Sequence, residues 1–73
     1  MDVFLYAIVC KEMKDGQEKM YLLFDEMYPI MAKDQQDAIS KATLSCAGDL
    51  EEAKDSAESD GKEFSYEIHI RPF

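Results

Sequence analysis

The chain has little of what usually holds very small proteins together. Its 73 residues include two cysteines, Cys10 and Cys46, one histidine and no tryptophan. The cysteines do not form a C-x-x-C pair, and a single histidine cannot complete a structural zinc site within one chain. A chain this short buries only roughly 60% of the surface that it exposes when unfolded. We therefore expect one domain, residues 1–73, with oligomerisation as the remaining source of added stability.

Long hydrophobic runs and chain-breaking residues are also scarce. Two prolines, three glycines and a hydrophobic share of 47% are typical of a folded chain rather than a disordered one. The apolar run Val3–Cys10 is too short to cross a bilayer, and no basic segment of a secretion signal precedes it. We expect no membrane contact, no secretion by signal peptide, and reduced thiols in a cytoplasm.

Basic residues are few: the chain has 8 of them and 16 acidic residues, for a net charge of −8. Such a balance repels phosphate backbones, so we expect no direct binding to nucleic acid. The acids gather late in the chain, and a run of this kind is typical of a solvated helix face. A nucleic-acid mimic that inhibits a host protein is the alternative. This candidate acidic surface comprises Asp49, Glu51, Glu52, Asp55, Glu58 and Asp60.

The first third of the chain predicts two strands. Val3–Glu12 is apolar on both alternating faces, which is typical of a central strand. Asp15-Gly16 predicts a turn inside a loop of about five residues, 13–17. Glu18–Tyr28 predicts the second strand, with pairing that weakens at Pro29 because proline has no amide donor.

The middle of the chain predicts helix. Asp34 is a good N-cap, and the helix is expected over Gln35–Cys46, with Gly48 ending it. A second, short helix is expected over Leu50–Ala57. The main helix carries a stripe of mostly small side chains that allows close approach to a sheet, and the stripe comprises Ala38, Ile39, Ala42, Thr43 and Cys46.

The last strand is expected over Glu63–Arg71, where apolar and polar residues alternate cleanly. Phe64, Tyr66, Ile68 and Ile70 form the apolar set, and Ser65, Glu67, His69 and Arg71 form the polar set. The predicted fold is α+β with the element order β-β-α-(α)-β. The first strand lies in the middle of a three-stranded sheet of order 2-1-3, and the main helix packs on one face.

A single helix cannot cover both faces of three strands, so one face is expected to stay open and partly apolar. Exposed apolar surface with a polar rim is typical of a protein interface, either with another protein or with further copies of this chain. The alternative is that the second helix or residues 29–31 fold over this face. The candidate interface residues are Tyr21, Leu23, Leu44, Glu67, His69 and Arg71.

The sequence offers few groups that could carry out chemistry. Cys10 and His69 lie on strands expected to be neighbours, but an acidic setting raises the pKa of a thiol and weakens it as a nucleophile. We find no phosphate-binding glycine loop, no catalytic motif and no calcium-loop spacing. We therefore expect no enzyme activity, no catalytic residue, no cofactor and no metal.

Three segments resemble small proteins encoded by tailed bacteriophages. These are Tyr28–Asp34 with the "A-K-D" start of a helix, then Ala38 with Lys41-Ala42, and the closing Glu67–Phe73 that ends in R-P-F. The acidic stretch between Gly48 and Glu63 departs from that pattern. The resemblance implies a viral protein in the virion or in the host cytoplasm, such as an accessory structural or assembly component, and it carries over no site residues.

Overall fold

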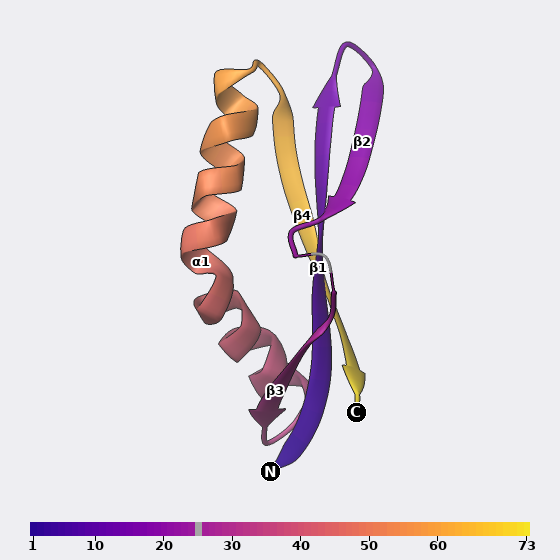
Figure 1. Cartoon of the computed structure of the whole chain (residues 1–73), viewed down its shortest axis with the longest axis vertical. Helices are drawn as coiled ribbons and strands as arrows, with labels where there is room; N and C mark the ends of the chain where they lie inside the picture. Colours follow the sequence, from indigo (N-terminus) through magenta and orange to yellow (C-terminus); the bar gives the residue numbers. More distant parts are fainter. Residues whose placement is uncertain (25) are drawn as a thin grey trace.

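Four strands and one helix follow in the order β-β-β-α-β in the computed structural model, which describes residues 1–24 and 26–73 (Figure 1). The α+β class is therefore confirmed. The elements are β1 Asp2–Lys14, β2 Gln17–Leu22, β3 Tyr28–Ala32, α1 Gln35–Ser59 and β4 Glu63–Pro72.

β1 is the central strand, as its two apolar faces predict. β2 and β3 follow one another along one edge of β1, and β4 lies along the other edge. All three pairings are antiparallel, and β4 pairs with β1 from Phe4 opposite Pro72 to Met13 opposite Glu63. The sheet is thus three strands wide, with the predicted order once β2 and β3 are taken as one interrupted strand.

The interruption corrects two expectations. The strand expected over Glu18–Tyr28 leaves the ladder after Leu22 and resumes at Tyr28, and position 25 lies outside the described residues. Pro29 does not end the pairing, since it lies within β3 opposite Leu5. β3 is an edge strand, and a missing amide donor is tolerated at an edge.

The β1–β2 turn is shorter than expected. Asp15 and Gly16 alone form it, both with positive φ (53° and 78°), and Lys14 pairs directly with Gln17. Two positive φ values are the mark of the two-residue hairpin turn that Asp-Gly sequences favour. The predicted five-residue loop is therefore wrong, and the β1–β2 pairing continues up to the two turn residues.

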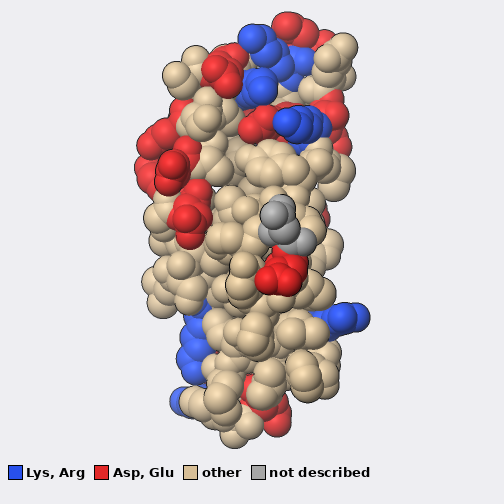
Figure 2. Space-filling view, in the orientation of Figure 1, with Lys and Arg blue, Asp and Glu red and all other residues tan. Residues whose placement is uncertain are grey.

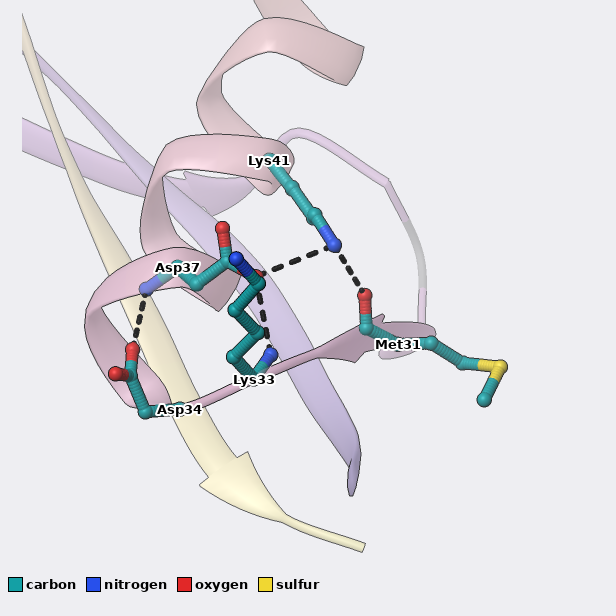
Figure 3. A network of polar contacts seen from close by, with 5 residues as sticks. All are labelled: Met31, Lys33, Asp34, Asp37 and Lys41. Atoms are coloured by element: carbon teal, nitrogen blue, oxygen red, sulfur yellow. Dashed lines mark hydrogen bonds and ion pairs between the residues drawn. The ribbon is translucent and has the colours of Figure 1, made fainter. Parts of the chain in front are cut away.

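A polar network fixes the start of α1 to the end of β3 (Figure 3). The predicted cap is confirmed, since the Asp37 amide donates to the Asp34 Oδ1 at 2.8 Å. The Lys33 amide donates in turn to Asp37 Oδ2 at 3.0 Å, which ties the first turn to the residue before its cap. Lys41 Nζ lies 3.2 Å from Asp37 Oδ2 and donates to the Met31 carbonyl oxygen at 3.1 Å.

α1 is one continuous helix, so the expected break at Gly48 is wrong. Gly48 is exposed in the helix interior and has no positive φ. The helix ends instead at Ser59, and Gly61, two residues beyond it, has a φ of 74°. The Gly61 amide donates to the Glu58 carbonyl and the Lys62 amide to the Ala57 carbonyl, both at 3.0 Å, which is a Schellman ending.

The core lies between α1 and one face of the sheet. α1 runs along this face for most of the molecule, whose longest dimension is 44 Å (Figure 1). On the helix the small-residue stripe is confirmed at Ala38, Ala42 and Cys46, and it continues beyond the expected helix end. The buried residues are Phe4, Tyr6, Ile8 and Cys10 of β1, Ala32 of β3, and Ala38, Ala42, Cys46, Leu50 and Ala57 of α1.

Candidate interface on the open sheet face

The sheet face opposite α1, which we call the open face, is lined along its centre by Val3, Leu5, Ala7 and Val9 of β1. These residues alternate with the buried set, and each keeps part of its surface exposed. For the part of the chain that the structure describes, Figure 1 shows no helix on this side of the sheet. Neither the C-terminal half of α1 nor residues 29–31 cover it, because that part of α1 continues along the helix side and Pro29 and Met31 belong to an edge strand of the sheet.

β2 and β3 add further apolar surface to the open face. Leu22 lies opposite Val9 and is 44% exposed, while Met31 lies opposite Val3 and is 57% exposed. Met20 of β2, opposite Lys11, is also 57% exposed. Side chains directly opposite one another in an antiparallel pair share a face, so these residues extend the apolar column of β1.

β4 supplies a polar margin to the same face. Arg71, His69 and Glu67 lie opposite Leu5, Ala7 and Val9, in that order. His69 Nε2 is 3.2 Å from Glu67 Oε2. Arg71 has no ion-pair partner among the described residues. Between Val3 and Val9 of β1, the open face is thus apolar over β1 and the β2–β3 edge and polar along β4.

A shallow hollow lies near the middle of the open face, at the position of Ala7. Its volume is about 510 Å³. Ala7 has the smallest side chain of the β1 column, which explains the depression. The hollow is lined by Ala7, Val9, Leu22, Met27, His69, Ile70 and Arg71.

The structure brings together three of the six residues expected at the interface. Glu67, His69 and Arg71 lie on the open face as the polar set of β4. Tyr21 and Leu23 do not, since both pack against the core on the helix side. Leu44 is 78% exposed on the outer surface of α1, apart from the open face.

The error at Tyr21 and Leu23 comes from the turn. A five-residue loop would put Glu12 opposite Glu18, and Tyr21 would then share the open face with Val9. The two-residue turn shifts the pairing by one residue and puts Tyr21 opposite Cys10. A slip of one residue sends every side chain of a strand to the other face.

The same shift puts Met20 and Leu22 on the open face, and neither is among the predicted interface residues. The signal that would have found them is the Asp15-Gly16 pair, since such pairs favour a two-residue connection. The alternation in β3 is reversed relative to that in β2. Tyr28 and Ile30 therefore face α1, opposite Tyr6 and Phe4.

The candidate acidic surface lies on the C-terminal half of α1 and the turn that follows it, away from the open face. All six acids are exposed, and Lys54 is the one base between the first and the last of them. Figure 2 shows the acidic side chains gathered along this half of the helix. This group of six acids thus lies on the side of the sheet opposite the apolar column.

Cys10 and His69 lie on neighbouring strands but on opposite faces of the sheet. Cys10 is fully buried under α1, whereas the His69 side chain is on the open face opposite Ala7. Burial raises the pKa of the Cys10 thiol, the Tyr21 hydroxyl lowers it in part, and the charge of Glu12 adds to the rise. The sheet therefore separates this thiol from the histidine that could have acted as its base.

Burial raises the pKa of Tyr21 to about 12, with further contributions from Cys10 and Glu12.

Within residues 1–24 and 26–73, no group of three or more His, Cys, Asp or Glu side chains is arranged to hold a metal ion. In the same ranges no helix is long and apolar enough to cross a membrane. Comparison of the chain with known protein families, with curated proteins and with solved structures finds no match.

Proposed function

We propose that this chain is a non-enzymatic protein-binding domain that acts through the open face of its sheet. The observation that carries the proposal is the exposed apolar column of β1, continued by Leu22 and Met31 and bordered by the charged side chains of β4. Contiguous apolar surface with a polar rim is the usual composition of a protein interface.

The energetics of a small domain favour such contact. A core formed by one helix with a stripe of small residues and one sheet face is expected to supply only about 3–5 kcal/mol of stability. Covering the open face removes Val3, Leu22 and Met31 from water, at about 25 cal/mol for each Å² of apolar surface. Binding therefore adds stability that this chain cannot reach alone.

The context we propose is an accessory structural or assembly component of a tailed bacteriophage, in the virion or in the host cytoplasm. The resemblance of Tyr28–Asp34 and Glu67–Phe73 to phage proteins supports this setting. In this structure Tyr28–Asp34 forms β3 and the cap of α1, and Glu67–Phe73 forms most of β4 with the residue that follows it. Both segments therefore belong to the sheet that presents the open face.

A second candidate function, inhibition of a host protein by nucleic-acid mimicry, is supported by the exposed acids of α1. Five of the six acids lie on one half of one helix, where Lys54 is the one base among them. A surface of this kind can occupy a basic groove, and such a complex weakens steeply with salt. Contact through the open face depends less on salt because apolar burial drives it.

One experiment separates the two candidates. The tagged chain is used to capture proteins from a bacterial host lysate at low and at high salt, together with the variants Leu22→Glu and Ser40→Glu. Leu22→Glu places a charge in the apolar column, whereas Ser40→Glu adds the same charge to the exposed surface of α1. Circular dichroism checks that both variants keep the fold.

We expect Leu22→Glu to reduce specific capture or self-association at least tenfold, because burying an unpaired charge costs several kcal/mol. Ser40→Glu should behave as the parent chain does. Contacts that persist unchanged in Leu22→Glu would argue against the open face. If those contacts also vanish at high salt, they favour the acidic surface of α1 instead.

A further inference from the structure

We propose that the open face binds a second copy of this chain, through a two-fold axis that runs across the strands beside Ala7 and His69. This inference rests on the proposed function, since it names the partner of the same surface. A two-fold dimer joins a patch to itself, so the patch must complement its own rotated image. The central part of the open face, from Leu5 to Val9 of β1 and from Glu67 to Arg71 of β4, meets this condition.

The charged margin is complementary to itself about His69. Glu67 and Arg71 lie two residues to either side of it on β4, opposite Val9 and Leu5. A two-fold rotation that reverses the strands brings Arg71 of one protomer opposite the partner's Glu67, and this contact occurs twice. Each pair would be a charge-assisted contact of the kind that fixes register at interfaces.

These two side chains do not pair with one another within one chain. The Cα atoms of residues four apart on a strand lie about 13 Å from each other, and strand side chains stand roughly perpendicular to the strand rather than toward one another. Glu67 contacts His69 at 3.2 Å, and Arg71 lacks an ion-pair partner among the described residues. An exposed arginine at the border of an apolar surface is therefore available for a carboxylate from outside.

The apolar columns match in the same rotation. Leu5 of β1 comes to lie opposite the partner's Val9, and Ala7 opposite the partner's Ala7. On the next strand position Pro29 lies opposite the partner's Leu22, because these residues pair with Leu5 and Val9. The small Ala7 at the axis leaves room for the Met27 side chains that line the hollow.

The other two-fold arrangement, with its axis along the strands, is unfavourable. It would place the β4 margin against the β2–β3 column, so that Arg71 faces the partner's Pro29 and Glu67 faces the partner's Leu22. Each charge would be desolvated against apolar side chains without an opposite charge, which costs several kcal/mol. The charge pattern thus selects one of the two orientations.

Size and long-range charge both permit the dimer. The molecule measures 44 × 19 × 19 Å, so its whole outline seen along the sheet normal is about 800 Å², comparable with the area that each partner buries in a standard interface. Among the paired residues of β1, β2 and β4, the charges on this face nearly balance, with Lys11 and Arg71 against Glu18, Glu63 and Glu67. Lys11 already pairs with Glu18 at 3.8 Å.

The test is a charge exchange followed by sedimentation at micromolar protein and moderate salt. We expect the parent chain to be a dimer, and Arg71→Glu and Glu67→Arg each to weaken it at least tenfold. In either variant like charges meet twice across the axis. An equimolar mixture of the two variants should recover the dimer, because one protomer then carries acids at both positions and its partner carries bases at both.

The outcomes separate this inference from the proposed function. A dimer that Leu22→Glu abolishes, but that charge exchange leaves unchanged, overturns this orientation. A dimer unaffected by Leu22→Glu overturns the role of the open face altogether. A parent chain that stays monomeric overturns self-association, while a host protein whose capture is lost in Leu22→Glu would keep the proposed function in place.

Discussion

At the scale of single residues, Cys10 and Cys46 behave as core side chains. Both are buried between α1 and the sheet, and the Cys46 thiol lies 3.8 Å from the Tyr6 hydroxyl, to which it can donate. Burial raises the pKa of the Cys10 thiol, so its neutral form predominates at pH 7. A buried neutral thiol is a poor nucleophile and a good space-filling group.

We therefore predict that neither thiol reacts with a water-soluble disulfide reagent at pH 7 unless the chain unfolds. With about 3–5 kcal/mol of stability, labelling should be slower than in the denatured chain by a factor of about 100 or more. The Ser45→Cys variant supplies the control, because Ser45 is exposed on α1. Rapid labelling of Cys10 in the folded chain would contradict its buried position and would support a role for Cys10 as a nucleophile.

The sequence alone could not show that Cys10 and His69 lie on opposite faces of the sheet. Their strands are neighbours, as expected, but Cys10 is opposite Tyr66 and His69 is opposite Ala7. The pairing sets them on different faces, and one sequence cannot show the pairing between distant strands. Alternation within Glu63–Arg71 did predict that the apolar side chains of that strand face the helix and that the polar ones face away from it.

At the scale of elements, α1 shows how the sheet overrides a local stop signal. Gly48 is a common helix-ending residue, yet α1 continues past it for eleven residues to Ser59. A 25-residue helix is about 37 Å long, close to the length of the 13-residue β1. Continuing the helix buries Leu50 and Ala57 against the sheet, which offsets the low helix propensity of one glycine.

We predict that Gly48→Ala stabilises the fold by about 0.5–1 kcal/mol, since glycine in a helix interior costs that much relative to alanine. A Cβ at this position meets nothing within 4 Å. Urea denaturation with an unchanged m-value would measure the gain.

The matched control is Gly61→Ala, where the φ of 74° belongs to a helix ending that alanine adopts poorly. This variant should lose about 1 kcal/mol or more. If Gly48→Ala were destabilising instead, the helix would be broken at that point.

At the scale of the whole molecule, β1 holds the other elements together. It pairs with β2 and β3 along one edge and with β4 along the other, while α1 packs on one of its faces. Among the described residues, the edge strands have hydrogen-bonding neighbours on one side alone. β1 is therefore the strand with hydrogen-bonded neighbours on both edges and a helix packed on one face.

We predict that the amides of β1 exchange with deuterium most slowly, because they open only when the whole domain unfolds. Their protection should reach about 10²–10⁴ in dilute solution, as expected for a stability of about 3–5 kcal/mol. Outward-facing amides of β2 should exchange far faster. Nuclear magnetic resonance resolves the two groups, and equal rates in β1 and β2 would contradict the central position of β1.

Local pattern determined much of this protein. The two apolar faces of Val3–Glu12 predicted the central strand, Asp34 predicted the helix start, and the alternation of Glu63–Arg71 predicted a strand with one polar face. Each of these signals lies within a few residues, where side-chain spacing and hydrogen bonding act directly. The sequence also indicated that one helix leaves one sheet face open.

Only the tertiary structure decided which side chains occupy that face. A one-residue difference in the Asp15-Gly16 turn moved Tyr21 into the core and Leu22 to the surface, because strand faces alternate with every residue. The length of the sheet likewise decided that α1 continues through Gly48. The register of Glu67 and Arg71 against β1 also depends on pairing between the two ends of the chain, and no short stretch of sequence carries that information.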